Sequence, residues 1–311
     1  MKLDITNKIY NDDEAARAHL EEQLWPAGPV CPHCGSFNST RLEGKAHRTG
    51  LLQCNENQCR EQFSVTVGTV FERSKIPLCK WVLVAHLFAA SKKGISSKQI
   101  QRMLGISYKS AWFMTMRLRE AAKDKYVTPI GGKGKVIESD ETFVGGKKKN
   151  VHKGKPEPKK HVVHALVERG GEVRAKHVAD VTAKSLRETL TTMAKRASEL
   201  HTDDFLSYMP IGKEFARHRT VAHTLGEYVS EDGKAHTQTI ESFFAIMKRG
   251  ITGSFHSVSE QHLQRYVDEF AFRWNNRSAL GVEDFERASQ LVKGAAGKRL
   301  TYRPTDETQN H

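Results

Sequence analysis

The sequence predicts an α/β protein with more than one domain, on the basis of three observations. Four cysteines stand in two close pairs near the N-terminus. Apolar residues recur with a helical period over residues 78–123, and β-rich runs alternate with helical ones from residue 136 onward. At 311 residues, the chain is long enough to bury two or three separate cores.

Basic residues dominate the charge of the chain. Lysine and arginine number 49 against 36 aspartates and glutamates, which gives a net charge of +13 and a pI near 9.5. This excess favours a polyanionic partner such as DNA, although a merely soluble basic protein would also show it. The most apolar run, residues 81–90, is about half the ~20 residues of a membrane span. We therefore expect a cytoplasmic protein with no membrane partner.

Four of the five cysteines follow the spacing C-x2-C-x19-C-x4-C: Cys31, Cys34, Cys54 and Cys59. In a reducing compartment such pairs favour metal binding over disulfides, and this spacing is typical of a structural Zn²⁺ site. Short alternating runs around the pairs predict a zinc ribbon. The second pair is wider than usual, which leaves His33 or His47 as alternative ligands, whereas Cys79 is expected to be a small buried side chain.

Residues 80–94 predict a largely apolar helix that ends at Gly94. Residues 95–122 then predict two helices with a tight break at Gly105. Ser96 and Gln99 have the spacing of a capping box. The buried stripe of the first of these two helices should consist of Ile100, Met103 and Leu104.

The second of these helices, which starts near Ser107, has an apolar and a basic face. Its period places three apolar residues inward, Ala111, Met114 and Leu118, and three basic residues outward, Lys109, Arg117 and Arg119. This layout is typical of a DNA-binding helix-turn-helix, whose second helix enters the major groove. An ordinary helical hairpin with a solvated basic face would show the same pattern.

The alternation of strands and helices over the rest of the chain predicts a further domain, which we expect to be the catalytic one. A strand over residues 136–144 carries Asp140, and a β-hairpin over 161–181 follows it. A helix over 182–199 then leads to a short extended piece that carries Asp203, and a later helix over 237–250 carries Glu241. This order of elements matches a ribonuclease H-like α/β domain.

Three carboxylates from separate segments can hold a pair of divalent metal ions, the usual device for cutting and joining phosphodiester backbones. On the helix of Glu241, Lys248 lies within roughly 20° of the glutamate and could hold a DNA phosphate. Each acid alone could be an ordinary strand-end, turn or solvated residue, and only their joint order favours catalysis. Glu141 and Asp204 are the neighbours most easily confused with the ligands.

Several segments together resemble the DDE-type transposases of bacterial insertion sequences, in particular the insertion-sequence family numbered fifteen ninety-five. The segments are CPHCG, FSVTVGTVFERSKIPLCKW, IESDETFVGGK and the block from HTQTIESFFAIMKRG to residue 277. The resemblance implies a ribonuclease H-like domain in which Asp140, Asp203 and a third residue bind two Mg²⁺ (or Mn²⁺) ions. Many relatives have asparagine where this chain has Gln238, and glutamine is a poorer magnesium ligand than a carboxylate. We therefore expect Glu241 to be the third ligand.

The resemblance also implies the reaction. A transposase of this kind binds the terminal inverted repeats of its element in double-stranded DNA, cleaves there and joins the freed ends to target DNA. Asp140 would bridge both metal ions, Lys248 matches the basic residue after the third acid, and Arg249 beside it should also contact DNA. A homo-oligomer in a synaptic complex, located at the bacterial nucleoid, is implied as well.

Two other functions fit parts of the pattern. One is a DNA-binding regulator, built on the zinc ribbon and helix-turn-helix, that derives from an inactive transposase. The other is a metal-dependent nuclease without strand transfer. The domains expected are an N-terminal helix (1–25), the zinc ribbon (26–76), the helix-turn-helix (77–128), the catalytic domain (129–280) and a C-terminal tail (281–311).

Overall fold

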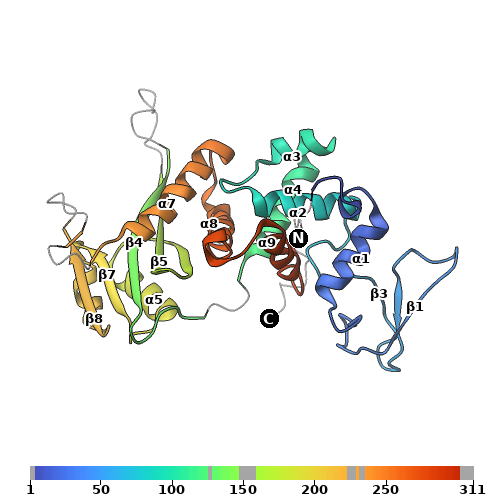
Figure 1. The fold of residues 1–311 in the computed structure, drawn as a ribbon, viewed down its shortest axis with the longest axis horizontal. Coiled ribbons are helices and arrows are strands. Elements are labelled where there is room, and N and C mark those ends of the chain that lie inside the picture. The colour runs from blue at the N-terminus through green and yellow to red at the C-terminus, as the bar shows by residue number, and fades with distance from the viewer. Residues whose placement is uncertain (1–3, 125–127, 147–158, 223–228, 231–234, 302–311) are drawn as a thin grey trace. The chain divides into compact units, whose positions relative to one another are not determined.

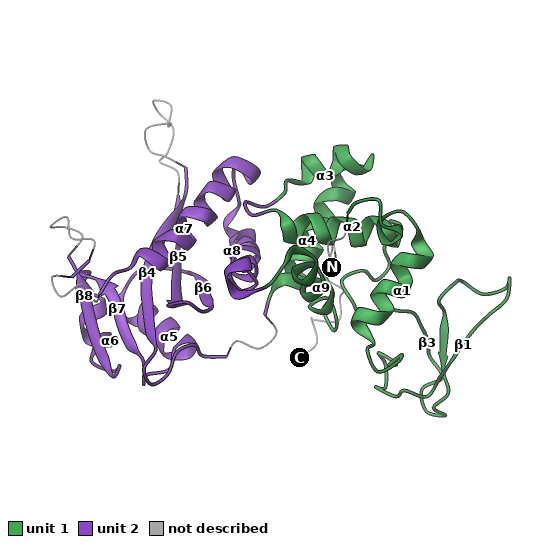
Figure 2. Cartoon of the chain, in the orientation of Figure 1, with its two compact units in different colours: residues 1–91, 95–123, 282–311 green, residues 92–94, 124–281 purple. Residues whose placement is uncertain are grey.

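The computed structural model describes residues 4–124, 128–146, 159–222, 229–230 and 235–301. The chain forms two compact units, which Figure 2 shows in separate colours. The first comprises residues 1–91, 95–123 and 282–311, and the second comprises residues 92–94 and 124–281. The zinc-ribbon residues and the helices that follow them thus share one unit.

The first unit begins with helical segments and a small sheet. The 3-10 turn η1 (Lys8–Tyr10) precedes α1 (Asp13–Leu24), in which the carboxylate of Asp12 accepts a hydrogen bond from the N–H of Ala15 and caps the helix. Three short antiparallel strands follow in the order β1-β2-β3. Their bounds are Ser39–Arg41, Leu52–Cys54 and Gln62–Phe63.

Four further helices belong to the described part of the first unit. They are α2 (Leu78–Ala90), α3 (Ser97–Leu104), α4 (Tyr108–Ala122) and α9 (Asp284–Lys293). α9 packs against α2, and the guanidinium of Arg287 donates to the carbonyl of Ala89. The residues expected to form a C-terminal tail therefore include a helix of the first unit. In the described part of the chain, no helix combines the length and apolar character that crossing a membrane requires.

The break between α3 and α4 lies at Gly105, as the sequence predicts. Gly105 adopts a left-handed backbone with φ +62°, and the hydroxyl of Ser96 accepts a hydrogen bond from the N–H of Gln99 at the start of α3. The predicted inward residues of α4, Ala111, Met114 and Leu118, are fully buried. Met103 is 52% exposed, so its assignment to the buried stripe of α3 is wrong.

The second unit is built on a five-stranded sheet in the order β6-β5-β4-β7-β8. β4 pairs antiparallel with β5, which pairs antiparallel with β6, whereas β7 lies parallel to both β4 and β8. The strand β8 was not predicted from the sequence. In chain order from β4 to β8, the strands span Val136–Gly145, Lys160–Glu168, Val173–Val178, Glu199–Asp203 and Arg217–Val221.

Helices cover both faces of this sheet (Figure 1). On one face, Val144 and Val163 pack with residues of α7 (Gln238–Gly250) and α8 (Glu260–Asn275). On the other face, Ile137 and Leu166 pack with α5 (Ala183–Met193) and α6 (Tyr208–Gly212). The short turns η4 (Ile251–Phe255) and η5 (Ser278–Leu280) flank α8. This mixed α/β arrangement is consistent with a ribonuclease H-like fold.

Candidate active site and metal centre

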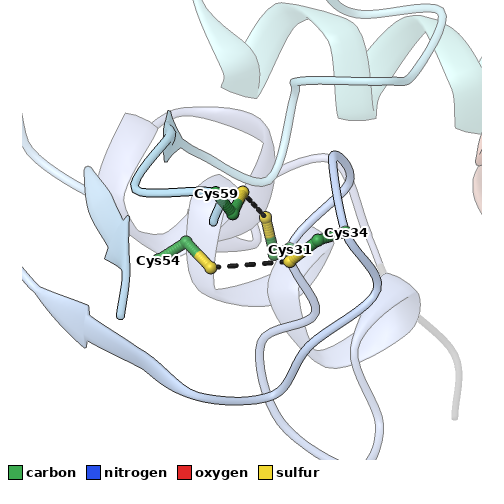
Figure 3. Close-up of side chains that lie close together, drawn as sticks. All are labelled: Cys31, Cys34, Cys54 and Cys59. Atoms are coloured by element: carbon green, nitrogen blue, oxygen red, sulfur yellow. Dashed lines mark hydrogen bonds between the residues drawn. The ribbon is translucent and has the colours of Figure 1, made fainter. Parts of the chain in front are cut away.

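The four paired cysteines come together in the first unit (Figure 3). The sulfur atoms of Cys31 and Cys59 lie 3.8 Å apart, and those of Cys34 and Cys54 lie 3.6 Å apart. All four sulfurs are within 4.8 Å of one another. In a tetrahedral site with zinc–sulfur bonds of about 2.3 Å, the sulfurs are about 3.8 Å apart. The quartet therefore fits a structural zinc ion.

The backbone turns tightly after each cysteine pair. Gly35 has φ +78°, and its N–H donates to the carbonyl of Cys31 at 2.8 Å. After the wider second pair, Arg60 takes the corresponding left-handed conformation, with φ +52°. Neither His33 nor His47 belongs to the group of close ligand atoms found among the described residues. The four thiolates are thus the ligand set that the geometry supports.

Asp140 and Asp203 lie on neighbouring parallel strands of the second unit. β4 and β7 pair in register from Val136↔Glu199 to Glu138↔His201. Asp140 lies two residues after Glu138, and Asp203 lies two residues after His201. Because residues two apart on a strand share a face, both aspartate side chains point to the same side of the sheet. Val144, on the same face of β4, packs into the core with α7, whose first turn contains Glu241. The fold therefore directs all three acids toward one face.

The electrostatics of Asp140 show that the acids are close enough to interact. The pKa of Asp140 is raised to about 7, first by burial and also by the negative charges of Glu141, Asp203 and Glu241, against the lowering effect of the hydrogen bond donated by the N–H of Glu141. Crowded carboxylate oxygens are the ligands that hard divalent cations prefer. The oxygens of Asp140, Asp203 and Glu241 are not all within 4.8 Å of one another, unlike the cysteine sulfurs.

Glu141 and Asp204, the two neighbouring acids, differ from these three. Glu141 points to the other face of β4, where its carboxylate accepts a hydrogen bond of 2.6 Å from the hydroxyl of Tyr208. Asp204 follows the last residue of β7. Asp203 itself ends that strand, and its carboxylate accepts from the N–H of Phe205 at 3.2 Å.

The helix α7 presents Glu241 and Lys248 on its exposed side. The hydroxyl of Thr237 donates to the carboxylate of Glu241 at 3.2 Å. Lys248, two turns later, lines an open cleft of about 770 Å³ together with Lys160, His161 and His256. Gln238 and Arg249 are also exposed, and the guanidinium of Arg249 donates to the carbonyl of Ala245.

A buried glutamate beside the acidic face was not identified from the sequence as functional. Glu138 is fully buried, and its carboxylate accepts hydrogen bonds from the guanidinium of Arg169 and from the N–H groups of Thr239 and Ile240. Arg169 also contacts the imidazole of His201. The signal in the sequence was a charged residue within an otherwise apolar stretch of strand, because such a residue is rarely buried without partners.

The three basic residues that were expected to face outward on α4 differ in their exposure to solvent. Lys109 is exposed in the first turn of the helix. Arg117 and Arg119 are only 5% and 1% exposed, so the expectation that they face outward is wrong. The guanidinium of Arg117 donates to the carbonyls of Val70 and Glu72 at 2.7 and 2.8 Å and lies over the ring of Phe113. These partners compensate for the loss of water around the charge.

Comparison with known proteins places these sites in matched domains. Residues 11–62, which include the four cysteines, match the transposase zinc-ribbon domain. Residues 132–275, which include the three acids and Lys248, match the ISXO2-like transposase domain. The chain is also 26% identical over 280 residues to an uncharacterized protein in transposable element ISH50 of Halobacterium salinarum, covering 86% of this chain and 92% of that protein. The resemblance found in the sequence is confirmed, because the chain carries both a transposase zinc-ribbon domain and an ISXO2-like transposase domain.

Proposed function

We propose that this protein is a DNA transposase that cleaves at the ends of an insertion sequence and joins those ends to target DNA. The observation that carries the proposal is the convergence of Asp140, Asp203 and Glu241 on one face of the sheet, within a transposase domain. Three carboxylates from separate elements are suited to holding metal ions for a reaction in which a water or 3′-hydroxyl oxygen attacks a DNA phosphorus and an ester oxygen of the backbone leaves.

In this proposal, Asp140, Asp203 and Glu241 hold two Mg²⁺ (or Mn²⁺) ions. When bound, such ions activate the attacking oxygen and stabilise the leaving one. Asp140 has a pKa of about 7, so near neutral pH its carboxyl group exchanges a proton for a cation readily. Lys248 lies on the same helix as Glu241 and would bind a DNA phosphate in the adjacent cleft.

Recognition of double-stranded DNA is assigned to the first unit. The pair α3 and α4 has the order and tight turn of a helix-turn-helix, in which the first residues of the second helix contact base edges. Lys98, Arg102 and Lys109 are exposed around that turn. The proposed ligands are the terminal inverted repeats and the target DNA, bound by a homo-oligomer that brings two ends together. Arg117 and Arg119 are left out of this surface because they are buried.

The proposal is tested by an end-cleavage and joining assay. Purified protein and magnesium are incubated with labelled DNA that spans the flanks of its own gene, with Asp140→Ala as the control. We expect cuts at the element ends and joined products from the wild type, and neither from the control. Cleavage without end preference or joining would favour the plain nuclease. Tight binding with no cleavage under varied metals would favour the DNA-binding regulator.

A further inference from the structure

A second cluster of metal-binding side chains lies in the second unit, apart from the acids of the proposed active site. It consists of His161 on β5, His177 on β6 and Glu260 at the start of α8. One ligand atom from each residue lies within 4.8 Å of the other two. The two histidines are half-buried, and Nδ1 of His161 is 3.5 Å from a carboxylate oxygen of Glu260.

The distance between His161 and Glu260 is close to that between two ligands of one coordinated ion. Two ligands about 2.0–2.2 Å from a tetrahedral zinc ion are roughly 3.4 Å apart. The rings of His161 and His177 meet edge to face, with centroids 5.7 Å apart and an interplanar angle of 78°. Two imidazoles and one carboxylate thus offer ligand atoms that lie within 4.8 Å of one another.

Neighbouring contacts hold the cluster in this arrangement. The ammonium of Lys159 donates to one oxygen of Glu260 at 2.7 Å, which leaves the other oxygen facing His161. One helical turn after Glu260, Gln264 accepts a hydrogen bond from the backbone N–H of His177 at 2.7 Å and donates to the carbonyl of Ala175. These bonds fix α8 against β6. Such outer partners orient the ligands of metal sites in proteins.

The cluster is distinct from the proposed catalytic carboxylates. Along the β4–β5 ladder, Asp140 pairs with Ala165 and Val144 pairs with His161. His161 therefore lies four residues further along the strand, roughly 14 Å from the level of Asp140. His161 also lines the cleft that contains Lys248, so a cation held here would add positive charge to the wall of that cleft.

We propose that His161, His177 and Glu260 form a binding site for zinc or a divalent transition metal of similar chemistry. Imidazole and carboxylate ligands suit such ions, and three protein ligands leave one coordination position for water or a phosphate oxygen. The site ties the N-terminus of α8 to the hairpin of β5 and β6. It does not depend on the proposed transposase chemistry.

The test counts zinc in the full-length protein. All samples carry Asp140→Ala, so that the acidic face does not hold a third ion, and are equilibrated with micromolar zinc and excess magnesium before desalting and elemental analysis. Without further changes, the protein should retain about two zinc ions per chain, one on the cysteines and one here. Both His177→Asn and Glu260→Gln should retain one fewer.

The matched control is His256→Asn, which removes a histidine from the same cleft but outside the cluster. It should retain as much zinc as the Asp140→Ala parent. Glu260 is 49% exposed, so its substitution tests the site even if His177→Asn fails to fold. A parent that holds a single zinc ion would overturn the proposal. Equal zinc in the Glu260→Gln and His256→Asn proteins would overturn it as well.

Discussion

The carboxylate of Glu138 in β4 accepts a hydrogen bond of 2.8 Å from the backbone N–H of Thr239 in the first turn of α7. The N–H of Ile240 donates to the same carboxylate oxygen. The first N–H groups of a helix have no partner within the helix, and a negative charge there is favourable. Glu138 is two residues before Asp140, and Thr239 is two residues before Glu241. This contact thus fixes the strand of one proposed ligand to the helix of another.

Glu138→Gln should destabilise the second unit by about 1.5–3 kcal/mol, the range for buried hydrogen bonds to a charged group. The amide keeps the size of the side chain but cannot accept from Arg169, Thr239 and Ile240 together. Urea denaturation measures the loss, and Glu188→Gln, whose side chain is 68% exposed, is the control. If the two variants unfold at the same urea concentration, Glu138 does not anchor α7.

The proposed acidic face predicts an unusual dependence of stability on pH. The pKa of Asp140 is raised to about 7, so the folded protein binds this proton more tightly than the unfolded chain does. The stability contributed by the protonated form is therefore lost as the pH rises from about 4 to 7. Above pH 7 the ionised carboxylate costs roughly 1–4 kcal/mol in the absence of a cation.

Asp140→Asn should consequently be more stable than the wild type at pH 8 in magnesium-free buffer. The difference should shrink toward pH 5, where Asp140 is mostly protonated in the folded protein. Thermal unfolding at the two pH values measures this, with Asp204→Asn as the control. Magnesium should then raise the melting temperature of the wild type and of Asp204→Asn, but not that of Asp140→Asn. A wild type that is the more stable protein at pH 8 would contradict the assignment.

The pattern of apolar residues explains which strands and helices were predicted correctly from the sequence. The β-rich runs of β4, β5 and β6 and the helix expected over residues 237–250 account for much of the core of the second unit, because the central strands bury apolar residues on both faces and α7 buries Ile240, Phe243 and Met247 against one of them. β8, with the sequence RHRTV, was missed because four of its five residues are polar and only Val221 is fully buried. α9 was missed because its partner, α2, is about 200 residues earlier in the chain.

The burial of charged residues could not be predicted from helical period alone. Arg117 was placed outward because arginine is usually exposed. Its partners include backbone carbonyls 45 and 47 residues away, which no local pattern reveals. Glu138 is similar, because the helix end that it caps is about 100 residues later in the chain. For the candidate site, the sequence therefore indicated the acids but not the residue that positions them.

Two basic residues of α4 should respond oppositely to substitution. Arg117→Met should lower the free energy of unfolding by about 2–4 kcal/mol, because it leaves the carbonyls of Val70 and Glu72 without their donor. Lys109→Ala should change stability by less than about 0.5 kcal/mol but weaken DNA binding and reduce its salt dependence. Denaturation and salt-dependent binding measurements distinguish the two. DNA binding by Lys109→Ala at wild-type strength would exclude this end of α4 from the DNA surface.

Loss of one cysteine ligand should release the zinc ion of the ribbon. Cys34→Ser should bind less zinc and expose residues 26–76 to protease, because metal binding to such sites contributes on the order of 10 kcal/mol to folding. Cys79→Ser is the matched control, since Cys79 lies outside the quartet. Zinc analysis and limited proteolysis measure the effect. Full zinc content in Cys34→Ser would show that three thiolates suffice or that another residue replaces the fourth.

Substitutions can decide whether Glu241 or Gln238 is the third metal ligand. Both are exposed near the start of α7, but the charge of Glu241 acts on Asp140, and Thr237 orients its carboxylate by a hydrogen bond. Glu241→Gln keeps the shape of the side chain and removes the charge needed to hold a divalent ion. Cleavage should therefore fall by more than the roughly 10–100-fold that loss of an outer-shell partner costs. Gln238→Asn, which introduces the residue that many relatives carry, should retain most of the cleavage rate. The reverse pattern, with Glu241→Gln active and Gln238→Ala inactive, would move the third position to Gln238 and leave Glu241 as a residue that only tunes the charge around Asp140.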